Sequence, residues 1–167
     1  MNPYWIKNER FRLAIIPRPR GQDWLADDVR ALRGAGVDVV VSALTPVETE
    51  EWGLRDESRC CSENGLTFLS FPIEDRSVPT SLREFDGLID SVTDYLREGK
   101  AVVVHCWGGV GRSSMIVACA LIRNGLSADS AFRVIEESRG RQVPYTAEQR
   151  QWVDRYSSRP PSHQDPA

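Results

Sequence analysis

The sequence has few lysines, no long apolar run and no secretory leader pattern. Lys7 and Lys100 are its only lysines, so arginine supplies nearly all of the positive charge. No stretch approaches the ~18 apolar residues that a membrane-spanning helix needs, and residues 1–11 lack the apolar segment of a secretory signal. We therefore expect no membrane partner and a cytoplasmic protein.

The cysteines also lack the spacing of a disulfide framework or of a structural zinc site. Cys60 and Cys61 are adjacent on a predicted helix, where they are either core residues or a means of resolving an oxidised Cys106 as a disulfide. A net charge of −3 gives no indication of a nucleic-acid partner. With 167 residues, 41% hydrophobic and 27% charged, the chain fits one globular domain.

The most informative stretch is residues 101–114, AVVVHCWGGVGRSS. Its valines predict a buried strand that leads to His105 and Cys106. A glycine-rich turn follows, and Arg112 then begins a helical pattern that ends at Gly125. The turn that we expect to bind phosphate consists of Trp107, Gly108, Gly109, Val110 and Gly111.

This order of residues suits the binding and transfer of a phosphoryl group. Glycines let backbone N–H groups point into a concave nest, and a helix N-terminus adds further donors and a positive dipole end. Arg112 can hold two phosphate oxygens at once. The positive field favours the thiolate of Cys106, the nucleophilic form, and Ser113 can donate to its sulfur. We expect His105 to tune Cys106 by hydrogen bonding and not to act as its base.

The remaining pattern alternates strands with helices. We expect strands at residues 4–6, 11–16, 37–44, 66–71 and 102–104, and helices at 23–33, near 46–51, 55–63, 82–97, after 112, 128–138 and 146–156. The fold class is α/β, with a mostly parallel central sheet of four to five strands and helices on both faces. Residues 1–157 form this domain, and residues 158–167 have the composition of a disordered tail.

The carboxyl ends of parallel strands carry the ligand site in such folds. The loops after Ile16, Leu44, Phe71 and His105 should therefore share one rim. In the second of these loops Glu48 is a candidate to brace Arg112. Arg18 and Arg20, in the first, are either surface residues or contacts for a second acidic group of the substrate.

His105-Cys106, five residues and then Arg112-Ser113 match H-C-x5-R-[ST], so the chain resembles the cysteine-dependent protein tyrosine and dual-specificity phosphatases. The closest resemblance is to the compact kinase-associated type, and it implies the protein tyrosine phosphatase-like fold. The turn contains no lysine, unlike that of the phosphoinositide phosphatases in the superfamily. Trp107 is bulky for a pocket floor, so its orientation bears on which phosphoester fits.

The resemblance also implies two supporting residues. The stretch Pro72-Ile73-Glu74-Asp75 is similar to the P-I-x-D segment that carries the general acid, which selects Asp75, with Glu74 and Asp86 as alternatives. Residues 139–149 are similar to R-x-x-x-x-P-x-T-x-x-Q, in which Gln149 corresponds to the glutamine that orients the hydrolytic water.

The sequence thus predicts a hydrolase that needs no metal or other cofactor and acts on a phosphorylated protein or peptide. Phosphotyrosine is the expected target, with phosphoserine and phosphothreonine left open, and the intermediate is a cysteinyl-phosphate. Alternatives are a catalytically silent phosphopeptide-binding module, or a phosphatase for a small phosphorylated metabolite or a nucleic-acid end. A sulfurtransferase explains neither Asp75 nor Gln149. Substrate identity and oligomeric state are not indicated.

Overall fold

The structure, a computed structural model, describes residues 2–8 and 10–159. A five-stranded sheet forms its centre, in the order β1-β2-β5-β3-β4. The strands are β1 (Tyr4–Trp5), β2 (Leu13–Ile16), β3 (Val39–Ser42), β4 (Thr67–Ser70) and β5 (Val102–His105). All pairings are parallel except that of β1 with β2. The predicted α/β class and mostly parallel sheet are confirmed.

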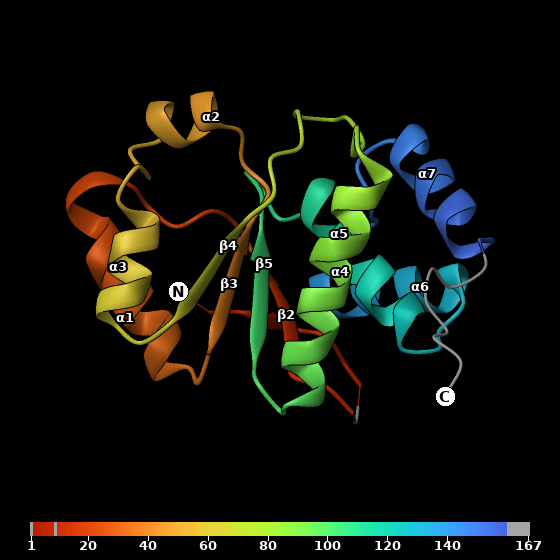
Figure 1. Cartoon of the computed structure of the whole chain (residues 1–167), viewed down its shortest axis with the longest axis horizontal. Coiled ribbons are helices and arrows are strands. Elements are labelled where there is room, and N and C mark those ends of the chain that lie inside the picture. Colours follow the sequence, from red (N-terminus) through yellow and green to blue (C-terminus); the bar gives the residue numbers. More distant parts are fainter. Residues whose placement is uncertain (1, 9, 160–167) are drawn as a thin grey trace.

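Helices cover both faces of this sheet (Figure 1). They are α1 (Leu25–Gly34), preceded by the 3-10 turn η1 (Gln22–Trp24), and α2 (Pro46–Glu51), α3 (Glu57–Glu63), α4 (Leu82–Arg97), α5 (Arg112–Arg123), α6 (Ala128–Arg139) and α7 (Ala147–Ser157). Helices α1 and α3 lie on one side, and α4 to α7 lie on the other (Figure 1). None of the helices in the described part of the chain has the length and apolar character needed to cross a membrane.

Two hydrophobic cores result from the alternation of side chains along the strands. On β5, Val102 and Val104 face the core beneath α4, α5, α6 and α7, whereas Val103 faces the core beneath α1 and α3. Every residue of β2, β3 and β5 is buried, and these strands are apolar except for Ser42 and His105 at their last positions.

The four parallel strands end level with one another. Ile16 and Ser42 both pair with His105, and Ser42 also pairs with Ser70. The loops that leave these strands therefore start from one edge of the sheet, as the sequence predicts. This edge carries the site described below.

The predicted elements differ from the observed ones mainly at their ends. The apolar run 37–44 contains a strand of only four residues, β3. Val37 and Leu44 lie beyond the ends of this strand and are apolar because they are buried in the core. The helix expected at 23–33 begins with the 3-10 turn η1, and residues 55–56 precede α3 instead of belonging to it. Of the predicted tail, residues 160–167 lie outside the described residues.

Candidate active site

Cys106 lies at the carboxyl edge of the sheet, between β5 and the loop that leads to α5. The residue is only 3% exposed. Helix α5 begins at Arg112, and no side chain caps its first N–H groups. Since those groups have no partner within the helix, they are open to an anion bound in front of Cys106.

Two glycines of the intervening loop are required by their surroundings. Gly109 has a φ of +67°, and a Cβ there would lie 2.8 Å from the carbonyl oxygen of Ile16. A Cβ at Gly111 would lie 2.8 Å from the side-chain oxygen of Gln149. Gly108 has no such constraint, because the nearest atom to its added Cβ is 3.9 Å away. The loop thus packs against both β2 and α7.

Arg139 holds the outer side of the same loop. Its Nε donates to the carbonyl of Gly109 at 2.8 Å, and its Nη2 donates to that of Gly108 at 3.2 Å. Its guanidinium also stacks 3.9 Å above the ring of Tyr4. By holding these carbonyls away from the cavity, Arg139 favours the orientation in which neighbouring N–H groups face inward. The sequence marked Arg139 only as the first residue of the segment that contains Gln149.

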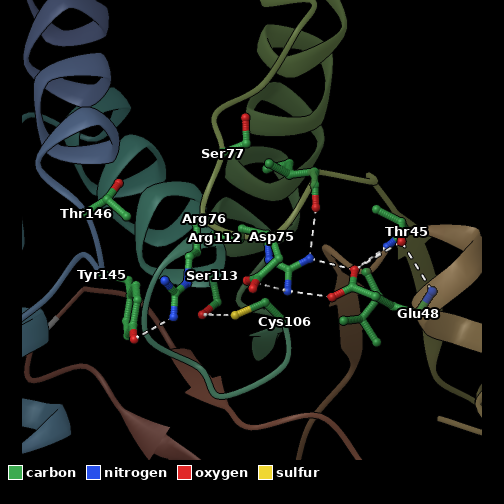
Figure 2. A network of polar contacts seen from close by, with 12 residues as sticks. Thr45, Glu48, Asp75, Arg76, Ser77, Cys106, Arg112, Ser113, Tyr145 and Thr146 are labelled. Carbon is green, nitrogen blue, oxygen red and sulfur yellow. Dashed lines mark hydrogen bonds and ion pairs between the residues drawn. The ribbon is translucent and has the colours of Figure 1, made fainter. Parts of the chain in front are cut away.

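Arg112 is fixed by partners from two other rim loops, as Figure 2 shows. Its two Nη atoms donate to the two oxygens of Glu48 at 2.7 and 2.8 Å, and Nη1 also donates to the carbonyl of Ile73 at 2.9 Å. Asp75 forms a further ion pair with Nη2 at 3.2 Å. Arg112 is 1% exposed. Glu48 therefore braces Arg112 in the fork-to-fork geometry that fixes a guanidinium plane.

The sulfur of Cys106 lies 3.4 Å from the hydroxyl of Ser113 (Figure 2). Burial by itself raises the pKa of the Cys106 thiol. The hydroxyl and N–H of Ser113, the charge of Arg112 and the N–H of Val110 lower it more, so the pKa lies below its ordinary value. The site thus favours the thiolate of Cys106.

His105 is fully buried beneath this loop. Its Nδ1 lies 3.3 Å from the carbonyl oxygen of Cys106, and its Nε2 lies 2.9 Å from a carboxylate oxygen of Glu57 on α3. Burial lowers the pKa of His105, but the charge of Glu57 and the contacts to Glu57 and Cys106 raise it above its ordinary value. Since His105 contacts the backbone and not the sulfur of Cys106, it is placed to orient the loop. Glu57 was not found from the sequence, because 48 residues separate it from His105 and no motif joins them.

The carboxylates proposed as general acids occupy different places. Asp75 lines the cavity beside Arg112, and its side chain is 66% exposed. Glu74 is exposed and is not among the residues that line the cavity. Asp86 lies on α4, where it accepts hydrogen bonds from Arg123 and Tyr156. Of the three, the structure brings only Asp75 to Cys106.

Gln149 is buried and also lines the cavity. Its amide nitrogen donates to the carbonyl of Ser77 at 3.0 Å, and its oxygen accepts from the N–H of Thr146 at 3.2 Å. Thr146 and Gln149 form a reciprocal capping box at the start of α7. The side-chain amide of Gln149 therefore joins the loop after β4, which contains Asp75 and Ser77, to the start of α7.

A small aromatic cluster from the second and fourth rim loops lies against the first rim loop. Trp107 lines the cavity and is 55% exposed, and its ring centroid lies 6.3 Å from that of Trp52. Arg18 stacks 4.1 Å above Trp52, and its N–H donates to the carbonyl of Trp107. Arg20 is instead bound to the buried carboxylate of Asp28, so its charge is met within the protein.

The cavity in front of Cys106 has a volume of about 210 Å³. Besides the expected residues, Arg76, Arg141 and Tyr145 line it. Arg76 directly follows the segment that carries Asp75, and Arg141 and Tyr145 occupy variable positions of the segment that carries Gln149, so the sequence assigned no role to these three residues. Within residues 2–8 and 10–159, no three His, Cys, Asp or Glu side chains come together as ligands of a metal ion.

Cys60 and Cys61 lie in the core beneath α1 and α3, on the opposite face of the sheet from the core that contains Cys106. Burial raises the pKa of both thiols, that of Cys61 to about 12. This placement agrees with the interpretation of the two cysteines as core residues.

Comparisons with known proteins agree with this geometry. The family model described as "Polymorphic toxin system, DSP-PTPase phosphatase" matches residues 15–126. Protein tyrosine phosphatase type IVA 3 of Mus musculus is 32% identical over 78 residues, which are 46% of this chain and 45% of that protein. Cyclin-dependent kinase inhibitor 3 of Homo sapiens is 21% identical over 138 residues, 81% of this chain and 65% of that protein. The chain thus spans less than two thirds of the length of these relatives.

Solved structures have the same fold. A kinase-associated phosphatase with serine at its catalytic cysteine superposes with a TM-score of 0.87 at 18% identity, and the match covers 98% of both chains. The active form of Tk-PTP gives a TM-score of 0.77 at 25% identity, covering 94% of this chain and 97% of that one. With the family model covering most of the sheet, the phosphate loop and α5, the chain belongs to the DSP-PTPase family of protein tyrosine and dual-specificity phosphatases.

Proposed function

We propose that this chain is a phosphatase that hydrolyses phosphotyrosine in proteins, with phosphoserine and phosphothreonine as further targets, through a cysteinyl-phosphate. One observation carries the proposal: a thiol of lowered pKa, an immobilised arginine and a carboxylate line one cavity of about 210 Å³. A binding module needs neither the nucleophile nor the carboxylate. Because the thiolate must stay reduced, the proposed location is a reducing compartment such as the cytoplasm.

The hydrogen bonds of Arg112 indicate how it would bind the phosphate. Both Nη1 hydrogens are used, by Glu48 and Ile73, and one Nη2 hydrogen is used by Glu48. Among the described residues, no acceptor is hydrogen-bonded to Nε or to the second Nη2 hydrogen. That edge of the guanidinium would bind two phosphate oxygens and displace Asp75 from its ion pair. The displaced carboxyl group would then be free to face the ester oxygen.

In the first chemical step the Cys106 thiolate attacks phosphorus, and the ester oxygen leaves with the proton of Asp75. Arg112 and the loop N–H groups stabilise the charge on the transferring oxygens. In the second step water attacks the cysteinyl-phosphate and gives a proton to Asp75. Gln149, which lines the cavity, would position that water with the amide hydrogen that is not donated to Ser77. The sulfur leaves as a thiolate, which the Ser113 hydroxyl stabilises.

Hydrolysis of p-nitrophenyl phosphate with EDTA and a thiol reductant present tests the proposal. The wild-type protein should be active, and Cys106→Ser should lose on the order of 10³-fold or more of kcat, since the nucleophile is removed. Cys106→Ser should still bind vanadate or phosphate. A folded, reduced wild-type protein without activity would instead indicate a phosphopeptide-binding module.

The role of Asp75 is tested with two leaving groups. In Asp75→Asn we expect a loss of about 10²–10⁴-fold with a phosphotyrosine peptide, because a poor leaving group needs a proton. The loss should be much smaller with an activated phenol such as p-nitrophenol. Glu74→Gln, the same kind of change at the neighbouring exposed residue, is the matched control. An equal loss with both esters would mean that Asp75 is not the acid.

A further inference from the structure

Large aromatic side chains are exposed at four places in the described part of the chain. They are Tyr4, Trp24, Trp107 and Tyr145. An arginine covers three of these rings: Arg139 lies over Tyr4, Arg20 over Trp24 and Arg76 over Tyr145. Within residues 2–8 and 10–159, no arginine or lysine lies over the ring of Trp107. Trp107 therefore keeps apolar surface that another molecule can cover.

Trp107 also lies next to the reacting group. It directly follows Cys106 in the chain and lines the cavity in front of that residue. Consecutive Cα atoms are only about 3.8 Å apart. Because the phosphate must lie in front of the Cys106 sulfur, the group esterified to the phosphate begins within reach of Trp107.

Contacts from two other rim loops hold Trp107 in place. The backbone N–H of Arg18 donates to the Trp107 carbonyl at 3.0 Å. The ring of Trp52 lies 6.3 Å from that of Trp107, at an angle of 52° between the ring planes. The guanidinium of Arg18 lies 4.1 Å from the centroid of the Trp52 ring. Arg18 thus supports both the backbone of Trp107 and the ring packed beside it.

Trp52 is itself fixed against the first rim loop. A Cβ at Gly21 would lie 1.8 Å from the carbonyl oxygen of Trp52, so the two backbones are in direct contact. The N–H of Gln22 donates to the carbonyl of Gly53 at 2.9 Å. A surface that is already fixed loses little conformational entropy when a ligand binds to it.

We propose that Trp107, supported by Trp52 and Arg18, packs against the phenyl ring of phosphotyrosine and causes a preference for this substrate over phosphoserine and phosphothreonine. In phosphotyrosine the ring is bonded directly to the ester oxygen, so it lies immediately beyond the phosphate. Two aromatic rings attract each other in tilted or offset arrangements, beyond the effect of the area they bury. Phosphoserine and phosphothreonine have no ring to cover Trp107. This inference rests on the proposed function and narrows its substrate class to phosphotyrosine.

Binding to Cys106→Ser tests the inference, because affinity does not depend on how easily the ester oxygen leaves. Two peptides of one sequence carry either phosphotyrosine or phosphoserine at the central position, and calorimetry measures their dissociation constants. The phosphotyrosine peptide should bind at least about 10-fold more tightly, since it also buries a ring. Adding Trp107→Leu should reduce this preference about 3–10-fold, the range expected for one aromatic pair. Trp107→Phe should retain most of it.

Two further variants complete the test, each in the Cys106→Ser protein. Trp52→Leu leaves the sequence of the phosphate loop unchanged and should also reduce the preference, because the Trp107 ring loses its support. Trp24→Leu is the matched control. Trp24 is exposed, but its ring is covered by Arg20 and it does not line the cavity, so the affinities for both peptides should stay unchanged.

Equal affinities of Cys106→Ser for the two peptides would overturn the inference. So would a Trp107→Leu change that weakens both peptides by the same factor, since the ring would then only shape the phosphate loop. Hydrolysis by the protein with Cys106 intact separates this inference from the proposed function. If that protein hydrolyses both peptides while Cys106→Ser shows no preference, the ring contact fails and the activity stands. If it hydrolyses neither while the preference is observed, the ring contact stands and the activity fails.

Discussion

At the scale of single residues, the hydroxyl of Ser113 lies 3.4 Å from the sulfur of Cys106. Burial opposes ionisation, and the Ser113 hydroxyl is the largest of the groups that lower the pKa of the thiol. Ser113→Ala should therefore raise this pKa, because a hydrogen bond to the charged form of the thiol is lost. The pH profile of alkylation by iodoacetamide, read at the peptide that contains Cys106, measures it. The wild-type midpoint should lie below the ordinary value of about 8.5.

Ser114→Ala is the matched control for this measurement. Ser114 is the next residue of α5 and is equally buried, but its hydroxyl has no hydrogen-bond partner among the described residues. Its removal should leave the midpoint of Cys106 alkylation unchanged. A Ser113→Ala midpoint equal to that of the wild type would show that the hydroxyl does not stabilise the thiolate.

The residues found from the sequence and those that were missed differ in one respect. Cys106, Arg112 and Ser113 lie within eight residues of one another, so their spacing alone indicates a phosphate loop. Glu57 contacts His105 from a distant segment that no local pattern marks. Arg141 lines the cavity from a variable position of the segment 139–149, so the pattern does not single it out. Contacts between distant segments depend on how the fold packs, and a local sequence motif carries no information about that packing.

At the scale of elements, the short helix α2 presents the carboxylate of Glu48 to Arg112. Glu48 accepts from the N–H of Thr45 at 2.9 Å in a capping box, and the same carboxylate holds both Nη atoms of Arg112. Glu48→Gln keeps the cap but removes the charge and one acceptor from a buried arginine. We expect kcat/KM for p-nitrophenyl phosphate to fall about 10–100-fold, since a charge-assisted hydrogen bond of roughly 1.5–3 kcal/mol is lost.

Glu50→Gln gives the control on the same helix. Glu50 pairs with Arg55 at the exposed surface, where an ion pair contributes little, so activity should stay within about twofold of the wild type. Similar activities for the two variants would mean that Arg112 does not depend on Glu48 for its position.

The elements themselves were largely predictable, because helix signals are local. Ser81 before α4 and Ser127 before α6 are N-caps whose side chains accept from the third residue of each helix. Strand ends were less predictable. The apolar run 37–44 continues past both ends of β3 because Val37 and Leu44 are buried in the core without extending the strand.

At the scale of the whole molecule, the pair of Glu57 and His105 joins the helices on one face of the sheet to the loop that holds Cys106. The side chains are 3% and 0% exposed, and their oxygen and nitrogen lie 2.9 Å apart. Glu57→Gln should lower the free energy of unfolding by about 3 kcal/mol, the usual cost of removing one partner of a buried pair. Denaturant unfolding of both proteins at several pH values measures this difference.

The difference should itself depend on pH. Because the pKa of His105 is raised in the folded protein, its protonated form stabilises the fold fully below the unfolded value of about 6.5. That contribution is lost as the pH rises through the raised pKa of His105. The difference in the free energy of unfolding between wild type and Glu57→Gln should therefore be largest below about pH 6.5 and smaller above the raised pKa. Glu63→Gln on the same helix, from an exposed pair with Arg59, should change stability by less than about 1 kcal/mol. A gap for Glu57→Gln that is constant with pH would show that His105 is not charged in the fold, and the loop would then be oriented by a neutral hydrogen bond.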